Sequence, residues 1–115
     1  MFDRSGRSNL GHALETTVAL ELERRGAEAA YVRTADNLEV DFLTHYPGGE
    51  QQLIQVSAEL DAAETVARET RALLAAAEEH PQASLHLITL TSDPIPTLPT
   101  QVAHHAAGAW LLEPP

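Results

Sequence analysis

Apolar residues recur with two different spacings along this chain, and the change of spacing predicts where helices and strands lie. The segment from Ser8 to about Arg25 has the spacing of a helix with one buried stripe, carried by Leu10, Leu14, Val18 and Leu22. Ser8 is expected to cap this helix at its start. Gly26 is expected to end it in left-handed backbone, where glycine has no steric penalty.

Three segments with the alternating pattern of a strand follow, at residues 28–34, 38–45 and 51–57. Turn-forming residues separate them: Ala35-Asp36-Asn37 comes after the first segment, and Pro47-Gly48-Gly49-Glu50 comes after the second. Short turns of this kind join neighbouring antiparallel strands. The three segments therefore predict a meander.

The second half of the chain predicts a helix, two strands and a short helix. Asp61 and Glu64 form a D-x-x-E capping box for a helix that runs to about Glu79, where His80-Pro81 ends it. Residues 84–91 are the most apolar segment and are expected to form the most buried strand. A loop with three prolines, at residues 92–99, leads to a strand at 101–105 and a short helix at 106–112 that packs Trp110.

The predicted order is α-β-β-β-α-β with a C-terminal strand and a short helix. A helical crossover after a meander returns the chain to a strand that is parallel to its neighbour. The fold class is therefore α/β, with a mixed sheet flanked by helices. Residues 1–7 are expected to be an N-terminal tail and residues 8–113 a single domain, because a chain of 115 residues suits one modest hydrophobic core.

Polar residues alternate with apolar ones on the second and third predicted strands. Residues two apart on a strand share a face, so Glu39 and Asp41 are expected to point one way, and Gln55 and Ser57 to share a face on the next strand. Their apolar neighbours are expected to point to the opposite side: Val40, Phe42, Ile54 and Val56. If the two strands pair through the Pro-Gly-Gly turn, Asp41 and Gln55 come close together on a common polar face.

Glu15, at the edge of the first helix's apolar stripe, is a third candidate oxygen ligand beside Asp41 and Gln55. Such a cluster of carboxylate and carbonyl oxygens suits a hard cation such as Mg²⁺ or Mn²⁺. His12, one turn from Glu15, could join the site or lie on the surface. Other interpretations stay open: Glu15 as a solvated helix residue, Asp41 on a solvent-facing strand edge, and Gln55 and Ser57 as hydrogen-bonded sheet residues.

Three motifs, in order and at this spacing, carry a resemblance to a known family: Gly11-His12-x-Leu14-Glu15, Glu39-Val40-Asp41-Phe42 and Ile54-Gln55-Val56-Ser57. Residues 8–113 resemble an uncharacterised domain found at the C-terminus of a family of bacterial and archaeal AAA-type ATPases. That domain is counted among the PD-(D/E)xK nuclease-like folds. The resemblance implies a restriction-endonuclease-like core and a prokaryotic source.

The resemblance also implies a role for each candidate residue. Glu15 matches the acid of the first helix, Asp41 the central metal-binding aspartate, Gln55 the second acid and Ser57 the lysine of the nuclease motif. Serine carries no positive charge to offset the negative charge that develops during phosphodiester hydrolysis. The chain holds no lysine at all, and Arg33 could stabilise charge without acting as a base.

An AAA-type ATPase is the partner that the resemblance implies, in cis or in trans. This chain has no Walker A motif, which would need a lysine. The resemblance therefore implies that the chain begins where the C-terminal domain would begin, and a detached gene product, a truncated relic and a fragment all stay open.

Composition changes this picture mainly through charge. Seven Arg, no Lys and seventeen Asp plus Glu give a formal net charge of −10, which disfavours independent binding to nucleic acid. Some arginines could still form a small basic patch: Arg4, Arg7, Arg33, Arg68 and Arg71. The lack of cysteine fits a reducing compartment, no apolar run approaches the ~20 residues of a membrane span, and the expected location is the cytoplasm.

Three functions are compatible with the sequence. The favoured one is a degenerate, non-catalytic nuclease-like accessory domain of an AAA-type ATPase system. The second is a divalent-metal-dependent nuclease that uses Glu15, Asp41 and Gln55 without a lysine. The third is a structural or dimerisation module that forms a homo-oligomer.

Overall fold

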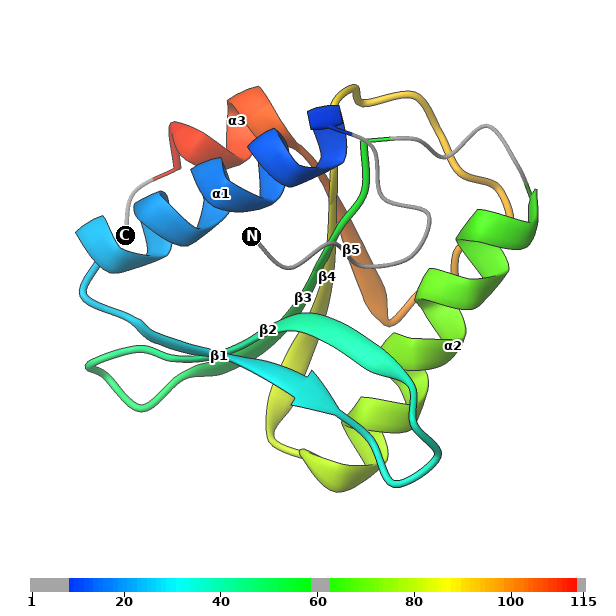
Figure 1. Ribbon diagram of the computed structural model, residues 1–115, viewed down its shortest axis with the longest axis horizontal. Helices are drawn as coiled ribbons and strands as arrows, with labels where there is room; N and C mark the ends of the chain where they lie inside the picture. Colours follow the sequence, from blue (N-terminus) through cyan, green and yellow to red (C-terminus); the bar gives the residue numbers. More distant parts are fainter. Residues whose placement is uncertain (1–8, 59–62, 114–115) are drawn as a thin grey trace.

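A five-stranded mixed sheet forms the centre of the molecule (Figure 1). The structure is a computed structural model that describes residues 9–58 and 63–113. The strands lie in the sheet in chain order: β1 (Glu28–Arg33), β2 (Glu39–His45), β3 (Gln51–Val56), β4 (Ala83–Thr89) and β5 (Val102–Ala106). Three helices flank them: α1 (Asn9–Arg24), α2 (Ala63–Glu79) and α3 (Ala107–Leu111).

The type of strand pairing changes once across the sheet, from antiparallel to parallel. β1, β2 and β3 pair antiparallel as the predicted meander, and β4 then pairs parallel to β3 after the α2 crossover. β5 is also parallel to β4, so residues 90–101 must carry the chain back along the sheet. Ile95 and Leu98 of this segment pack against the core beside α2. The proline-rich loop therefore serves as a second crossover without a helix.

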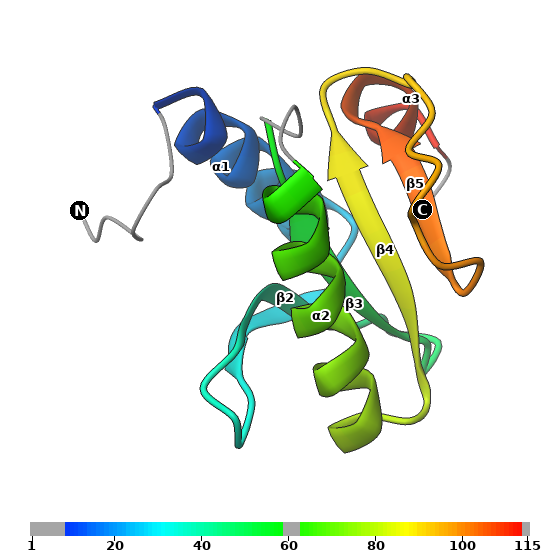
Figure 2. The same cartoon turned by 90° about the vertical axis from the view of Figure 1, so that its right-hand side faces the viewer.

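Helices cover both faces of the sheet. α2 lies on one face, and α1 and α3 lie together on the other, as the two views show (Figures 1 and 2). Each face has its own hydrophobic core. Leu73 of α2 is fully buried in the first core, whereas Leu22 of α1 and Trp110 of α3 are buried in the second. Trp110 anchors the C-terminal helix, as predicted.

Backbone conformation at the turns matches the turn residues of the sequence. Gly26 follows α1 with φ +77°, and Asn37 and Gly49 adopt φ +65° and +96° in the two turns of the meander. These left-handed conformations favour glycine and asparagine. The predicted caps Ser8 and Asp61 and the predicted tail 1–7 lie outside the described residues.

A β-bulge interrupts β2 at Asp41. The register between β1 and β2 shifts by one residue between Ala30 and Val32, so the single residue Tyr31 lies opposite two residues, Asp41 and Phe42. An extra residue in one strand breaks the alternation of its side chains between the two faces. The bulge therefore changes which side chains of β2 share a face.

The expectation that Val40 and Phe42 point to the same side is wrong. Val40 packs in the core under α2 together with Leu43, whereas Phe42 packs in the core under α1 and α3. Both faces of β2 and β3 are buried, since Leu53 and Ile54 also enter opposite cores. The common polar face predicted for these strands does not form. β2, with five consecutive buried residues, is also more buried than β4.

Candidate functional site

Asp41 and Gln55 lie side by side where β2 and β3 separate, as their predicted pairing required. Both are almost fully buried, with 2% of Asp41 and 1% of Gln55 exposed. The Gln55 Oε1 atom accepts a hydrogen bond from the Asp41 backbone N–H at 2.9 Å, and its Nε2 donates to the Glu39 carbonyl at 3.0 Å. In return, Asp41 Oδ2 accepts the backbone N–H of Val56 at 2.8 Å.

These side-chain bonds continue the ladder past its last backbone pair. Regular pairing of β2 with β3 begins at Phe42 and Ile54, one position beyond Asp41 and Gln55. Because Ile54 and Val56 both enter the core under α1, Gln55 leaves the strand on the α2 side and folds back over the β2 backbone. A buried backbone N–H or C=O needs a partner. The amide of Gln55 supplies two of these partners at once.

Ser57 follows β3 directly and is 8% exposed. Its backbone N–H donates to the Ile88 carbonyl at 2.9 Å, which extends the parallel pairing with β4. Glu15 lies half-buried on α1, one residue beyond buried Leu14, and α1 packs across β1 and β3. The structure therefore brings Asp41 and Gln55 together, whereas Glu15 belongs to the helix that covers the opposite face of the sheet from the α2 side of Gln55.

Few side chains at these positions are available to bind a metal ion. Across residues 9–58 and 63–113, no three His, Asp or Glu side chains gather as a metal site of that size requires. Mg²⁺ and Mn²⁺ favour several oxygen ligands. Here one Asp41 oxygen and the Gln55 amide oxygen already accept backbone hydrogen bonds. The arrangement is suited to holding two strands together.

A second polar cluster, at β4 and β5, went unpredicted. The rings of His86 and His105 are stacked, with centroids 5.1 Å apart and an interplanar angle of 25°. His86 Nδ1 lies 2.9 Å from His105 Nε2, Ser84 Oγ lies 2.8 Å from His86 Nε2, and Glu113 Oε2 lies 3.5 Å from His105 Nδ1. Burial, and then the neighbouring His105, lowers the pKa of His86 to about 4.

The sequence carried part of this signal. Ser84 and His86 are two apart within an apolar strand, which places them on one face. Adjacent residues of a strand point to opposite faces, and His104 and His105 do so: His104 Nε2 lies 2.7 Å from Thr89 Oγ1, whereas His105 contacts His86. Burial lowers the pKa of His104 as well, with His105 contributing.

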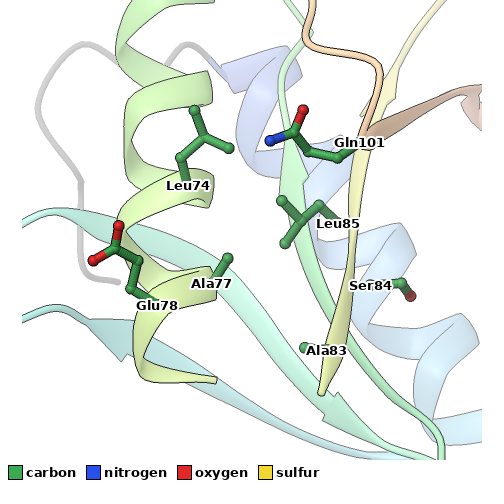
Figure 3. Close-up of a pocket in the computed structure, with 7 residues that line it drawn as sticks. All are labelled: Leu74, Ala77, Glu78, Ala83, Ser84, Leu85 and Gln101. Carbon is green, nitrogen blue, oxygen red and sulfur yellow. The ribbon is translucent and has the colours of Figure 1, made fainter. Parts of the chain in front are cut away.

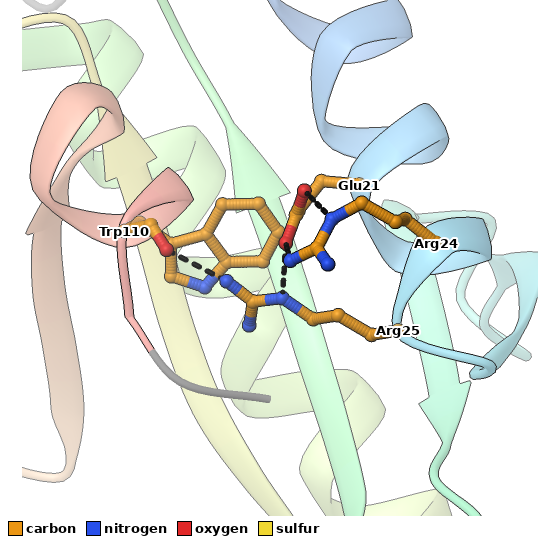
Figure 4. Close-up of polar contacts among 4 residues, drawn as sticks. All are labelled: Glu21, Arg24, Arg25 and Trp110. Atoms are coloured by element: carbon orange, nitrogen blue, oxygen red, sulfur yellow. Dashed lines mark hydrogen bonds and ion pairs between the residues drawn. The ribbon is translucent and has the colours of Figure 1, made fainter.

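Acid partners hold most of the described arginines. Arg24 and Arg25 both donate to Glu21, and Arg25 also stacks on Trp110 (Figure 4). These hydrogen bonds lower the pKa of Glu21 to about 2. Of the arginines suggested for a basic patch, Arg33 pairs with Glu39 at 3.2 Å and Arg68 lies 3.8 Å from a glutamate. Arg33 is thus a member of an exposed ion pair.

An open cavity of about 650 Å³ lies between α2 and β4 (Figure 3). Its walls combine the apolar side chains Leu74 and Leu85 with the polar ends of Glu78 and Gln101. It lies on the α2 side of the sheet, and the His86–His105 pair lies on the α3 side.

No family model matches the sequence, and comparisons with curated proteins and with solved structures return no match. Within the part of the chain that the structure describes, none of the helices is long and apolar enough to cross a membrane. Function must therefore be inferred from the geometry and from the sequence motifs.

Proposed function

We propose that this chain is a degenerate PD-(D/E)xK nuclease-like accessory domain of an AAA-type ATPase system and does not hydrolyse phosphodiesters. The order of its elements supports a restriction-endonuclease-like core: a helix, a three-strand meander, a helical crossover and a strand parallel to β3. The ATPase partner, in cis or in trans, rests on the resemblance of the three motifs.

The observation that carries the proposal is the hydrogen bonding of Asp41 and Gln55. In the nuclease interpretation these two positions would hold the metal with oxygen atoms directed at the ion. Here the amide of Gln55 bridges two backbone groups of β2, and Asp41 accepts a backbone N–H of β3. The same two side chains that would bind Mg²⁺ or Mn²⁺ instead link β2 to β3 beyond their last backbone pair.

Charge supports the same conclusion. Ser57 stands in the lysine position without a positive charge, and the chain has no lysine elsewhere. Transition-state charge in phosphoryl transfer needs fixed cationic partners. Arg33, the nearest substitute suggested by the sequence, donates to Asn37 and Glu39. A net charge of −10 also opposes the approach of a polyanionic substrate.

Titration of Mn²⁺ into the wild-type chain, Asp41→Asn and Asp41→Ala tests the proposal. Asn keeps an oxygen acceptor for the Val56 N–H, whereas Ala leaves it unpaired, at a cost of about 1–3 kcal/mol. We expect no saturable Mn²⁺ binding in any of the three and a melting temperature that falls mainly in Asp41→Ala. Saturable binding in the wild type that is lost in both variants would overturn the proposal in favour of the metal-dependent nuclease.

The partner is tested separately. Chemical cross-linking in the source cells, followed by mass spectrometry, is expected to join this domain to a chain that carries a Walker A motif. Light scattering on the purified domain addresses the homo-oligomer. A stable homo-oligomer together with cross-links only between copies of this chain would replace the ATPase role with the structural one.

A further inference from the structure

A continuous row of polar contacts runs from Ser84 to Glu113 across β4 and β5. Ser84 Oγ lies 2.8 Å from His86 Nε2, and His86 Nδ1 lies 2.9 Å from His105 Nε2. His105 Nδ1 in turn lies 3.5 Å from Glu113 Oε2. The strands are parallel, with Ile88 opposite His105, so the two histidines are diagonal neighbours on one face. Four side chains therefore form one row, which begins at an exposed hydroxyl.

The carboxylate at the end of the row determines the direction of each contact. An ionised carboxylate only accepts, so His105 Nδ1 carries the N–H that points to Glu113. A neutral imidazole has one N–H and one lone pair, so His105 Nε2 accepts the N–H of His86 Nδ1. His86 Nε2 then keeps a lone pair and accepts the O–H of Ser84. Every donor in the row thus points from Ser84 toward Glu113.

We propose that Ser84 is a nucleophile for acyl transfer from uncharged carboxylic esters, with His86 as its general base. A serine hydroxyl within hydrogen-bond reach of an imidazole, which a third group orients, is the arrangement that activates serine in hydrolases. Ser84 supplies the hydroxyl, His86 the imidazole and His105 the orienting group. His105 and Glu113 are positioning residues. Ser84 is exposed, so an ester can reach its Oγ atom.

The second histidine explains how a buried imidazole can serve as the base. Burial, and then the neighbouring His105, lowers the pKa of His86 to about 4, so a positive charge on the His86 ring is unfavourable. When His86 Nε2 takes the proton of Ser84, His86 Nδ1 can pass its own proton to His105 Nε2 across 2.9 Å. The charge then lies on His105 beside the Glu113 carboxylate, which remains ionised.

Ester hydrolysis at this site takes two steps. Attack forms the bond between Ser84 Oγ and the acyl carbon and breaks the bond from that carbon to the leaving oxygen, which takes up the proton from His86 Nε2. Water then attacks the acyl carbon, gives one proton to His86 Nε2 and leaves as part of the carboxylic acid, and that proton returns to Ser84 Oγ. A net charge of −10 opposes anionic acyl donors and favours uncharged esters. The site shares no residue with the Asp41–Gln55 pair, so either proposal can fail alone.

Acetylation by p-nitrophenyl acetate tests the nucleophile. The tag-free chain is expected to release p-nitrophenolate and to carry an acetyl group on Ser84, detected by mass spectrometry. The chain has no lysine, so side-chain amines do not compete for the acetyl group. Ser84→Ala is expected to lose the adduct and the protein-dependent release, and Ser92→Ala, at an exposed position after β4, is expected to keep both. Acetyl groups only on other residues, or unchanged release by Ser84→Ala, would overturn the proposal.

The pH profile of acetylation tests the row of contacts behind Ser84. One added proton on either imidazole turns His86 Nε2 from an acceptor into a donor, so acetylation is expected to fall in acid. Glu113 and His104 act electrostatically on the two rings. Glu113→Gln removes the negative charge that favours the added proton, so the fall is expected at lower pH than in the wild type. Glu78→Gln, at an exposed glutamate of α2, is expected to keep the wild-type profile.

His86→Gln tests the base directly. Removing a general base is expected to slow the acetylation of Ser84 by about 10²–10⁴-fold. A folded His86→Gln chain that acetylates Ser84 at the wild-type rate would overturn the proposal. So would identical pH profiles for the wild type and Glu113→Gln. If His86→Gln does not fold, Ser84→Ala and the wild-type profile decide the question, because both leave the two imidazoles in place.

Discussion

The guanidinium of Arg25 lies over the indole ring of Trp110, with its Cζ atom 4.3 Å from the ring centroid, and donates to the Trp110 carbonyl at 2.7 Å. The same side chain, of which 5% is exposed, also donates to Glu21 at 2.7 Å. Arg25, which directly follows α1, thereby links Glu21 of α1 to Trp110 of α3. It explains how a five-residue helix at the end of the chain stays in place.

Arg25→Lys is expected to destabilise the domain by about 1–3 kcal/mol, because lysine cannot donate to two acceptors in a fixed plane while stacking on a ring. Arg24→Lys is the matched control, since Arg24 contacts the same glutamate with 61% of its side chain exposed. Urea denaturation followed by tryptophan fluorescence measures both. Equal losses of stability in the two variants would contradict the role assigned to Arg25.

Gln55→Leu tests the two hydrogen bonds by which the Gln55 amide links β3 to the backbone of β2. Leucine has a similar size but leaves the Asp41 N–H and the Glu39 carbonyl without their present partner, and each buried orphan costs about 1–3 kcal/mol. We expect a loss of about 2–4 kcal/mol in the free energy of unfolding. Gln101→Leu, at an exposed position, serves as the control. A change in the free energy of unfolding within about 0.5 kcal/mol, typical of a surface position, would show that these hydrogen bonds do not stabilise the fold.

Gln55→Glu tests whether replacing the Gln55 amide with a carboxylate is enough to create a metal-binding site beside Asp41. The carboxylate loses the N–H that donates to the Glu39 carbonyl and brings a second negative charge beside Asp41, so the variant should be less stable without metal. Mn²⁺ is expected to raise its melting temperature and to leave the wild type unchanged, because only the variant offers two acidic ligands.

Gln51→Glu, on the same strand and away from Asp41, controls for added charge. Recovery by Mn²⁺ in both variants would point to non-specific binding. Failure of Mn²⁺ to stabilise Gln55→Glu would mean that the position has changed by more than one side chain.

Local signals made much of the fold predictable. A helix with one apolar stripe, and turns built on Gly26, Asn37 and Gly49, depend on neighbours within a few residues. The structure follows them, except that Leu10 of the stripe is 52% exposed. The bulge at Asp41 was not predictable in this way, because it depends on how β2 pairs with β1. Alternating polar residues suggested an open face, whereas Gln55 is buried against backbone groups of another strand.

The histidine pair shows the same limit. Spacing along β4 places Ser84 and His86 on one face, and adjacency places His104 and His105 on opposite faces. The register between β4 and β5 depends on the path of the crossover at residues 90–101. The alternation of residues along each strand does not indicate that path. The 2.9 Å contact between His86 and His105 follows from that register.

Acid is expected to weaken the ion pair with Glu21 that holds Arg25 beside α3. Hydrogen bonds from Arg24 and Arg25 lower the pKa of Glu21 from 4.5 to about 2. A depressed folded-state pKa means that the carboxylate contributes stability that is fully present above pH 4.5 and is lost as the pH falls toward 2. The difference in melting temperature between the wild type and Glu21→Gln should therefore be constant above this range and shrink within it.

Glu23→Gln, two residues further along α1, controls for the general loss of negative charge in acid. Its difference from the wild type should be small and should not follow the same window. Melting curves at closely spaced pH values measure all three chains in parallel. If the gap between the wild type and Glu21→Gln keeps its full size near pH 2, the ion pairs of Glu21 with Arg24 and Arg25 do not stabilise the fold, and the direct contacts of Arg25 with Trp110 must hold α3.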